Sequence, residues 1–358
     1  MSALRALRFL VLALLLAASA AQAQQNRLHV YNWNNYITED TVARFEQACR
    51  CRLVQDYYAD NEEMLAKLAA GAAGYDILVP TGDAVATLIR QGALRPLDHA
   101  RLPKLANLKA EFLGLWFDRG NRYSVPYAYS VTLLGYNEQK LRELGIPTDS
   151  WAAIFEPMYL ERLRGKVTVL DSQRELMAAA LIYLGHPAFD TDPAHWKRAR
   201  ELILRAKPYW AAFNAASYIK ELSIGNIWLA HGYSNDMHTA RQDAQKAGRK
   251  FSIGYSTPKE GAVFAVDNLV LHTSGRNPAL AYQFMNLLLE PESSAALSNA
   301  IGAGSPNAAA MRLIRPEIAN NKAIFPGAEQ LAKMQQLREL TRAERRLLNR
   351  MWIEIKVR

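Results

Sequence analysis

Aromatic, amide and acidic side chains stand just past the ends of several expected strands. The candidate ligand-binding residues are Trp33, Asn34, Asn35, Tyr36, Thr81, Glu175, Tyr233, Asp236 and Asp267. Carboxylates accept hydrogen bonds from ammonium groups, and aromatic faces attract positive charge while they cover methylene segments. No lysine belongs to this set, so the combination indicates a site for an organic cation.

Alternating strands and helices must position these residues. The expected strands are 28–33, 52–58, 75–79, 165–170, 226–231 and 262–271. The expected helices are 39–48, 61–71, 172–184, 194–207, 234–246, 278–289 and 292–300. This alternation predicts an α/β fold with a mostly parallel sheet covered by helices. Such sheets bind ligands beyond the carboxyl ends of their strands, where the candidate residues lie.

The length of 358 residues favours two domains or lobes, and no flexible linker separates them. We expect the chain to cross between lobes near residues 130 and 265 and again after about residue 310. The predicted first lobe comprises residues 27–130 and 266–310, and the second comprises 131–265 and 311–358. Several short crossings predict a cleft with a hinge.

Composition and the N-terminal segment indicate an exported globular protein. Half of the residues are hydrophobic and 22% are charged, which excludes a disordered chain. The net charge of +9 favours anionic surfaces, but it is too small and too scattered to predict nucleic-acid binding. Residues 1–23 have the charged, apolar and small-residue parts of a signal peptide, ending at Ala21-Gln22-Ala23, with no lipid-attachment cysteine after them. We therefore predict a soluble periplasmic protein.

Cys49 and Cys51 are the only cysteines, and they are separated by one residue. Export permits a disulfide between them, although such a small ring is strained, so both the bonded and the free state remain open. The pair lacks the further ligands that zinc requires, and the seven histidines show no ligand-like spacing. No metal or cofactor is expected.

At the candidate residues the sequence resembles the periplasmic polyamine-binding proteins, the spermidine/putrescine receptors of ABC importers. The resemblance covers about residues 27–356. Its matching pieces are Tyr31-Asn32-Trp33, Tyr36-Ile37, Asn61-Glu62, Tyr75-Asp76, Val79-Pro80, Pro126-Tyr127, Tyr136-Asn137, Ser150-Trp151, Asp171 with Glu175, Pro258-Lys259-Glu260-Gly261, Asp267 and Pro306-Asn307. Each piece is short, but their order and spacing together are specific.

The resemblance implies a two-lobed type II periplasmic binding protein. It also implies that the protein is a monomer and needs no cofactor. It would hold a polyamine-like cation between its lobes and deliver it to the permease subunits of an ABC transporter in the inner membrane. By position, Trp33 and Tyr36 resemble aromatics that line the cleft, and Thr81 stands where serine is common. Glu175 matches the acid at one end of the ligand.

The resemblance extends to further residues of both lobes, with some departures. Asp236 and Asp267 match acids that grip an amino group, and Tyr233 stands where tryptophan is usual. Ala265 and Ala303 stand where aromatics are usual. Since smaller side chains open space, a modified polyamine or a cationic amino-acid derivative is an alternative ligand, and a membrane sensor is an alternative partner.

Several of the acidic residues could have a structural role instead of binding a ligand. Ser172 and Glu175 can form a capping box, and Asp236 in a first helical turn is favoured by the helix dipole. Asp171 is expected to end its strand, and Asp83 to start a helix. Asp267 could nucleate a turn.

An esterase is the main alternative of a different class. Gly232-Tyr233-Ser234-Asn235-Asp236 lacks only the second glycine of a nucleophile elbow, and Asp267 and His272 follow in the order of a hydrolase triad. An aspartate in place of that glycine would oppose an oxyanion nearby, and no glycine-rich oxyanion segment precedes it. The sequence therefore favours a binding protein over an enzyme.

Overall fold

The computed structural model describes residues 26–357, so the predicted signal peptide at 1–23 lies outside the described residues. Within this range no helix is both long enough and apolar enough to cross a membrane.

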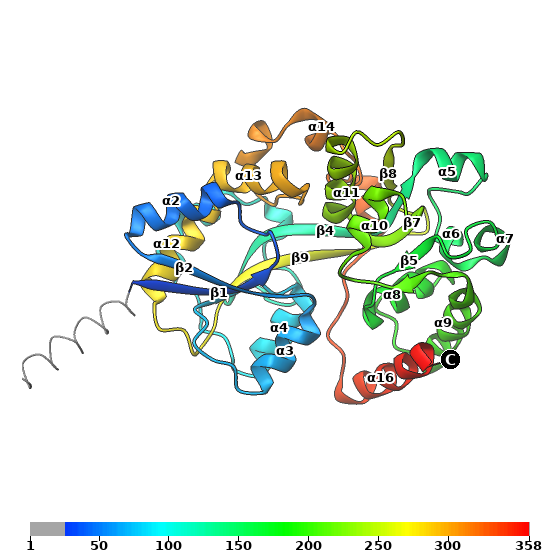
Figure 1. The fold of residues 1–358 in the computed structure, drawn as a ribbon. Coiled ribbons are helices and arrows are strands. Elements are labelled where there is room, and N and C mark those ends of the chain that lie inside the picture. Colours follow the sequence, from blue (N-terminus) through cyan, green and yellow to red (C-terminus); the bar gives the residue numbers. More distant parts are fainter. Residues whose placement is uncertain (1–25, 358) are drawn as a thin grey trace, which may run out of the picture.

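A single mixed sheet runs through the molecule (Figure 1). Its strand order is β2-β1-β3-β9-β4-β7-β5-β6, with β8 beside β4 and β10 beside β9. The strands are β1 (Arg27–Trp33), β2 (Arg52–Tyr58), β3 (Ile77–Leu78), β4 (Ser124–Asn137), β5 (Val167–Val169), β6 (Ala212–Phe213), β7 (Leu229–Tyr233), β8 (Ile253–Ser256), β9 (Ala262–Leu271) and β10 (Met334–Gln335). β1 pairs in parallel with β2 and β3, and β5 pairs in parallel with β7 and β6.

The long antiparallel strands β4 and β9 join two lobes (Figure 1). At one end β9 pairs with β3, and at the other end β4 pairs with β7 and β8. Nearly every residue of β4 is buried, because both faces of this strand are covered. The fold is therefore the two-lobed α/β architecture that the sequence predicts.

Helices cover the sheet in each lobe. In the first lobe they are α2 (Glu39–Cys49), α3 (Asn61–Ala69), α4 (Gly82–Arg90) and α12 (Pro278–Leu288). In the second they are α5 (Glu138–Glu143), α6 (Ala152–Phe155), α7 (Pro157–Leu160), α8 (Gln173–Tyr183), α9 (Pro193–Ala206), α10 (Tyr218–Ile224), α11 (Ser234–Lys246) and α16 (Arg342–Val357). Beside the crossing strands lie α13 (Pro291–Ile301), α14 (Pro316–Ala319) and α15 (Ala328–Leu331), and short 3-10 turns include Ala309–Leu313.

Apolar side chains from distant segments hold each lobe together. In the first lobe Phe45 of α2 packs on Phe284 of α12, with ring centroids 4.6 Å apart. In the second lobe the apolar face of α16, formed by Leu348, Met351 and Ile355, is buried in the core. This packing follows from the helical spacing of these residues.

Some element boundaries differ from the sequence prediction. The strand expected at 226–231 is β7 at Leu229–Tyr233, because the ladder with β4 begins only at Leu229. The strand expected at 75–79 pairs only at Ile77–Leu78. The open question at Cys49 and Cys51 is settled in favour of a disulfide, which the intervening Arg50 permits by adopting a positive φ of 52°.

Candidate functional site

A cavity of about 660 Å³ lies between the two lobes. All nine candidate residues line it, from β1 and its following loop, the N-cap of α4, α8, β7, α11 and β9. The fold thus brings together side chains that are up to 234 positions apart in the chain, from Trp33 to Asp267.

The loop after β1 forms one wall of the cavity. The indole Nε1 of Trp33 donates to the carbonyl of Val79 at 2.8 Å, which fixes the ring in place. Asn34 and Asn35 are exposed at the rim, and Asn35 adopts a positive φ of 60°, a conformation that asparagine tolerates well. Tyr36 is buried, and its backbone carbonyl accepts the Tyr127 hydroxyl at 2.6 Å.

Asp267 occupies the middle of β9 beneath this loop. Its side chain accepts the Tyr36 hydroxyl at 2.9 Å, and the residue is only 3% exposed. Burial raises the pKa of Asp267 to about 7, although the hydrogen bond from Tyr36 opposes the rise. The residue continues its strand instead of nucleating a turn, so the turn alternative is wrong.

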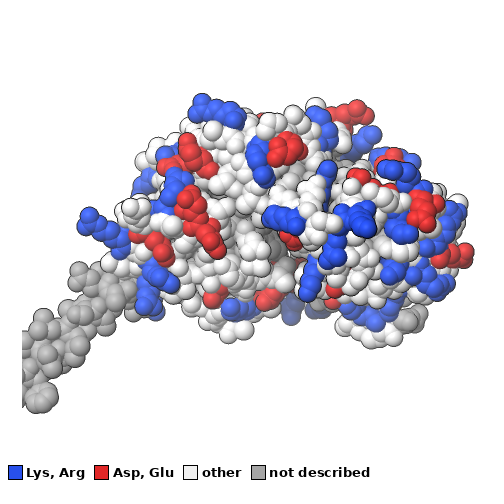
Figure 2. All heavy atoms as spheres, turned by 45° about the horizontal axis from the view of Figure 1, so that its top comes forward, with Lys and Arg blue, Asp and Glu red and all other residues white. Residues whose placement is uncertain are grey.

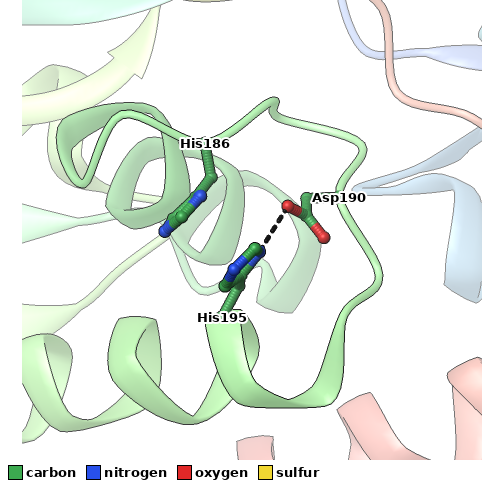
Figure 3. A group of neighbouring side chains, drawn as sticks. All are labelled: His186, Asp190 and His195. Atoms are coloured by element: carbon green, nitrogen blue, oxygen red, sulfur yellow. Dashed lines mark hydrogen bonds and ion pairs between the residues drawn. The ribbon is translucent and has the colours of Figure 1, made fainter.

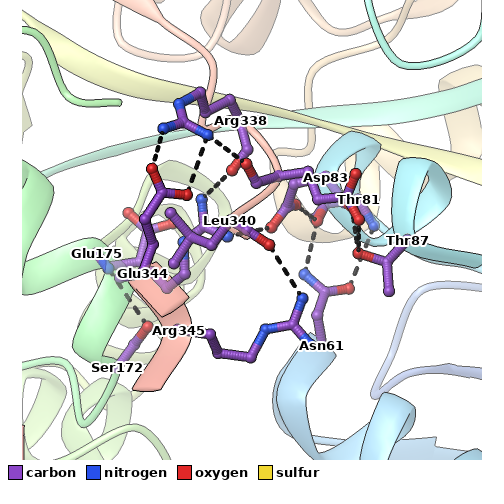
Figure 4. Close-up of polar contacts among 12 residues, drawn as sticks. Asn61, Thr81, Asp83, Thr87, Ser172, Glu175, Arg338, Leu340, Glu344 and Arg345 are labelled. Carbon is purple, nitrogen blue, oxygen red and sulfur yellow. Dashed lines mark hydrogen bonds and ion pairs between the residues drawn. The ribbon is translucent and has the colours of Figure 1, made fainter. Parts of the chain in front are cut away.

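Thr81 lines the cavity, but its hydroxyl is already engaged. The Oγ1 atom donates to Asp83 at 2.6 Å and accepts the side-chain N–H of Asn61 at 2.6 Å (Figure 4). Thr81 thereby orients Asp83, which lies in the first turn of α4 as expected and also lines the cavity.

Glu175 enters the cavity from α8 in the second lobe. Ser172 caps this helix by accepting the backbone N–H of Glu175. The Glu175 carboxylate accepts the Thr132 hydroxyl at 2.8 Å, so the side chain is directed toward β4 and not toward the cap. Burial raises its pKa to about 7.

Asp236 lies in the first turn of α11 and accepts hydrogen bonds from Tyr218 and from the amide nitrogen of Asn235. Burial raises its pKa to about 6. Tyr218 approaches closely because residue 232 is glycine: a Cβ there would lie 2.4 Å from the Tyr218 ring. Gly232 thus allows Tyr218 to pack where its hydroxyl can donate a hydrogen bond to Asp236.

Aromatic rings cover part of the cavity. Trp33 packs against Tyr58 with centroids 4.6 Å apart, and Tyr58 donates to the carbonyl of Val79. Tyr233 lines the opposite side. Ala265 also lines the cavity, whereas Ala303 is buried in the first-lobe core and does not belong to the lining. Of the two alanine departures, only Ala265 therefore adds space to the cavity.

Several lining residues were not singled out from the sequence. They include Tyr58, Trp116, Phe117 and Arg174. Tyr58 ends β2 at the same edge of the sheet as Trp33, so the strand-end rule could have found it. Asn235 is buried, and its Oδ1 atom has no hydrogen-bond partner among the described residues, which leaves an acceptor free for a ligand.

Arg174 is a cation in this otherwise acidic lining. Its Nη1 atom lies 3.1 Å from Asp83 Oδ2, and its Nη2 atom donates to the carbonyl of Arg338. Positive charge elsewhere is external: in Figure 2, Lys and Arg side chains predominate over the visible surface of the second lobe. The net positive charge of the chain therefore coexists with a cavity whose charged lining residues, apart from Arg174, are acids.

A group of potential metal ligands lies outside the cavity, at the start of α9. The expectation of no histidine cluster is wrong here, because His186, Asp190 and His195 come together (Figure 3). The two imidazole rings are stacked with centroids 3.7 Å apart, and Asp190 bonds to His195 at 2.7 Å. Since the lone pairs of two nearly parallel rings do not point at a common centre, this stacked and hydrogen-bonded group would have to rearrange to bind a metal.

The residues of the esterase alternative are engaged elsewhere. Ser234 is 1% exposed, and its Oγ atom accepts the backbone N–H of Val131. His272 bonds to Ser274, and Asp267 bonds to Tyr36. The three residues make no triad hydrogen bond with one another.

Residues 40–326 match the family described as bacterial extracellular solute-binding protein, a family of binding proteins and not of enzymes. The putrescine/cadaverine-binding protein of Pseudomonas aeruginosa is 53% identical over 98% of this chain and 99% of its own length. The putrescine-binding periplasmic protein PotF of Escherichia coli is 34% identical over 93% of this chain and 92% of its own length.

A solved structure from Listeria monocytogenes, described as belonging to a spermidine/putrescine ABC transporter, superposes with a TM-score of 0.85. It shares 27% identity over 93% of this chain and 99% of its own. From the family match and these relatives, the chain belongs to the bacterial extracellular solute-binding proteins.

Proposed function

We propose that this protein captures a polyamine-like organic cation, foremost a short diamine, in the periplasm and delivers it to an ABC importer. The observation that carries the proposal is the set of buried carboxylates that the two lobes direct into one cavity. Asp267 comes from the first lobe, and Glu175 and Asp236 come from the second. Burial of these acids is unfavourable unless a cation compensates them.

The aromatic rings suit the hydrocarbon part of such a ligand. Trp33 and Tyr36 stand on one side of the cavity, and Tyr233 stands on the other. Each contact between a shielded cation and an aromatic face contributes about 1–2 kcal/mol. The relative that is 53% identical is named for putrescine and cadaverine, both diamines, which supports this ligand class over larger polyamines.

Ligand binding by contact with both lobes would stabilise a closed form. In this proposal residues 27–130 and 266–310 move as the first lobe, and residues 131–265 and 311–358 move as the second. Export through the signal peptide at 1–23 places the protein in the periplasm, where the closed form docks as a monomer onto the permease subunits in the inner membrane.

A thermal-shift and calorimetric screen tests the proposal. The panel contains putrescine, cadaverine, agmatine, spermidine, spermine, acetylated polyamines and basic amino acids. Putrescine at 100 times its Kd should add about 2.7 kcal/mol to the free energy of unfolding. Asp236→Asn and Asp267→Asn should each remove this stabilisation, because each leaves an ammonium group without a charged acceptor.

Asp171→Asn is the matched control, since Asp171 pairs with Lys356 at 2.8 Å and does not line the cavity. It should respond to putrescine like the parent. The proposal fails if no amine stabilises the parent, or if Asp236→Asn and Asp267→Asn respond as the control does.

A further inference from the structure

Arg174, the second residue of α8, places a fixed positive charge in a cavity proposed to bind cations. Its side chain and that of its partner Asp83 are only 14% and 17% exposed. Asp83 is also held by the Thr81 hydroxyl, and Arg174 by the carbonyl of Arg338. The pair is therefore anchored on both sides, unlike a mobile pair on an open surface.

This ion pair joins three parts of the molecule. Arg174 belongs to the second lobe, Asp83 belongs to α4 of the first lobe, and Arg338 belongs to the segment 334–341 that leads to α16. The same segment contacts α4 through Glu339, which accepts the Thr87 hydroxyl at 3.0 Å. On its other side, Arg338 pairs with Glu344 of α16 (Figure 4). The guanidinium is consequently held inside the cavity by the fold itself.

The acids of the cavity form two groups. Asp267 accepts the Tyr36 hydroxyl, and Asp236 also acts electrostatically on Tyr36. Glu62, Asp83 and Glu175 act on one another and on Arg174. Asp60 also lines the cavity and acts on Glu62. Of the acids around Arg174, Asp83 is already paired with this internal cation.

We propose that Arg174 is a built-in counter-cation that limits the ligand to two charged nitrogens, so that the cavity selects diamines over triamines. The guanidinium occupies the acceptor that a third ammonium group would need, and it repels such a group by like charge. This inference rests on the proposed function, and it identifies Arg174 as the residue that determines how many positive charges the bound ligand carries.

Calorimetric titration with putrescine and spermidine tests the inference. The parent should bind putrescine more tightly than spermidine. Arg174→Gln removes the charge and keeps a polar side chain, so the affinity ratio of spermidine to putrescine should rise about 10-fold or more. Arg174→Lys retains a positive charge and should keep the parent ratio within about 3-fold.

A double variant separates charge from shape. Arg174→Gln combined with Asp83→Asn restores the net charge of the second acidic group to its parent value. If charge number sets the selectivity, the ratio returns to within about 3-fold of the parent. If the double variant keeps the high ratio of Arg174→Gln, steric space is responsible and the inference is overturned.

Arg90→Gln serves as the matched control, because Arg90 pairs with Glu339 outside the lining of the cavity. Its ratio should equal that of the parent. A parent that binds neither amine contradicts the proposed function. Circular dichroism establishes that each variant is folded. If the parent binds putrescine but the affinity ratio of Arg174→Gln does not rise, or that of Arg174→Lys does not stay near the parent value, this inference alone is contradicted.

Discussion

Asp267 illustrates how the protein sets the protonation of its cavity. Burial raises its pKa to about 7, and the Tyr36 hydroxyl lowers it by donating a hydrogen bond to the ionised form. The pKa values of Glu175 and Asp236 are raised for the same main reason, to about 7 and about 6.

These raised pKa values predict a pH-dependent affinity. Without ligand, the three buried acids bind protons as the pH falls through 7 and 6, whereas an ammonium ligand favours their ionised forms and expels those protons. Putrescine affinity should therefore rise from pH 5 to pH 8, because deprotonation removes the competitor. The measurement is calorimetry at pH 6.5 in buffers of different ionisation enthalpy, which reports proton release directly.

The same titration at pH 8.5 is the control, since the acids are almost fully ionised there while the diamine is still mostly doubly charged, so proton release should be much smaller than at pH 6.5. Affinity that falls between pH 5 and pH 8, or proton uptake at pH 6.5, would contradict the assignment of these acids to the site.

At this scale the sequence predicts most of the cavity residues because strand ends converge in an α/β sheet, whereas Asp267 reaches the cavity from the middle of β9. All nine candidates line the cavity, although Thr81 proves to orient Asp83 through its hydroxyl. Arg174 escaped prediction because arginine side chains usually lie at the solvated surface. Arg174 is held in the cavity because Asp83 of the other lobe lies next to it, and the sequence does not reveal this contact.

Among the elements, the loop after β1 carries the best-fixed aromatic of the site. Trp33 is held by its hydrogen bond to Val79 and by Tyr58. Because these two contacts fix the orientation of the ring, it is preorganised to cover a bound cation. We expect Trp33→Ala to lower the affinity for putrescine about 5- to 30-fold, corresponding to about 1–2 kcal/mol.

The measurement is the Kd from calorimetry, compared with Trp352→Ala as a matched control on α16, outside the cavity. Equal affinities of Trp33→Ala and the parent would show that Trp33 only packs the lobe.

Element types were easier to predict than element boundaries. The helix at 234–246 is α11 as expected, because its pattern continues over several turns. The start of β7 was predicted too early because Ile227 and Trp228 are apolar. The sequence does not reveal that pairing with β4 starts only at Leu229. The full length of β4, Ser124–Asn137, was also missed, because a doubly buried strand lacks alternation.

At the scale of the whole molecule, β4 and β9 connect the lobes and the segment 334–341 passes between them. The cavity lies between the lobes, so a ligand there contacts both only when they are close together. Sequence length and the absence of a linker predict this division, but the contact of Glu339 with α4 depends on tertiary packing that no local pattern encodes.

The most direct test of ligand recognition is a crystal structure of the protein grown with putrescine at pH 8. We predict one diamine in the cavity, with one amino nitrogen within hydrogen-bond distance of Asp236 or Asp267 and the other close to Glu175, and with Trp33 against the carbon chain. An anion in the cavity, or a diamine bound elsewhere while the cavity stays vacant, would contradict the account.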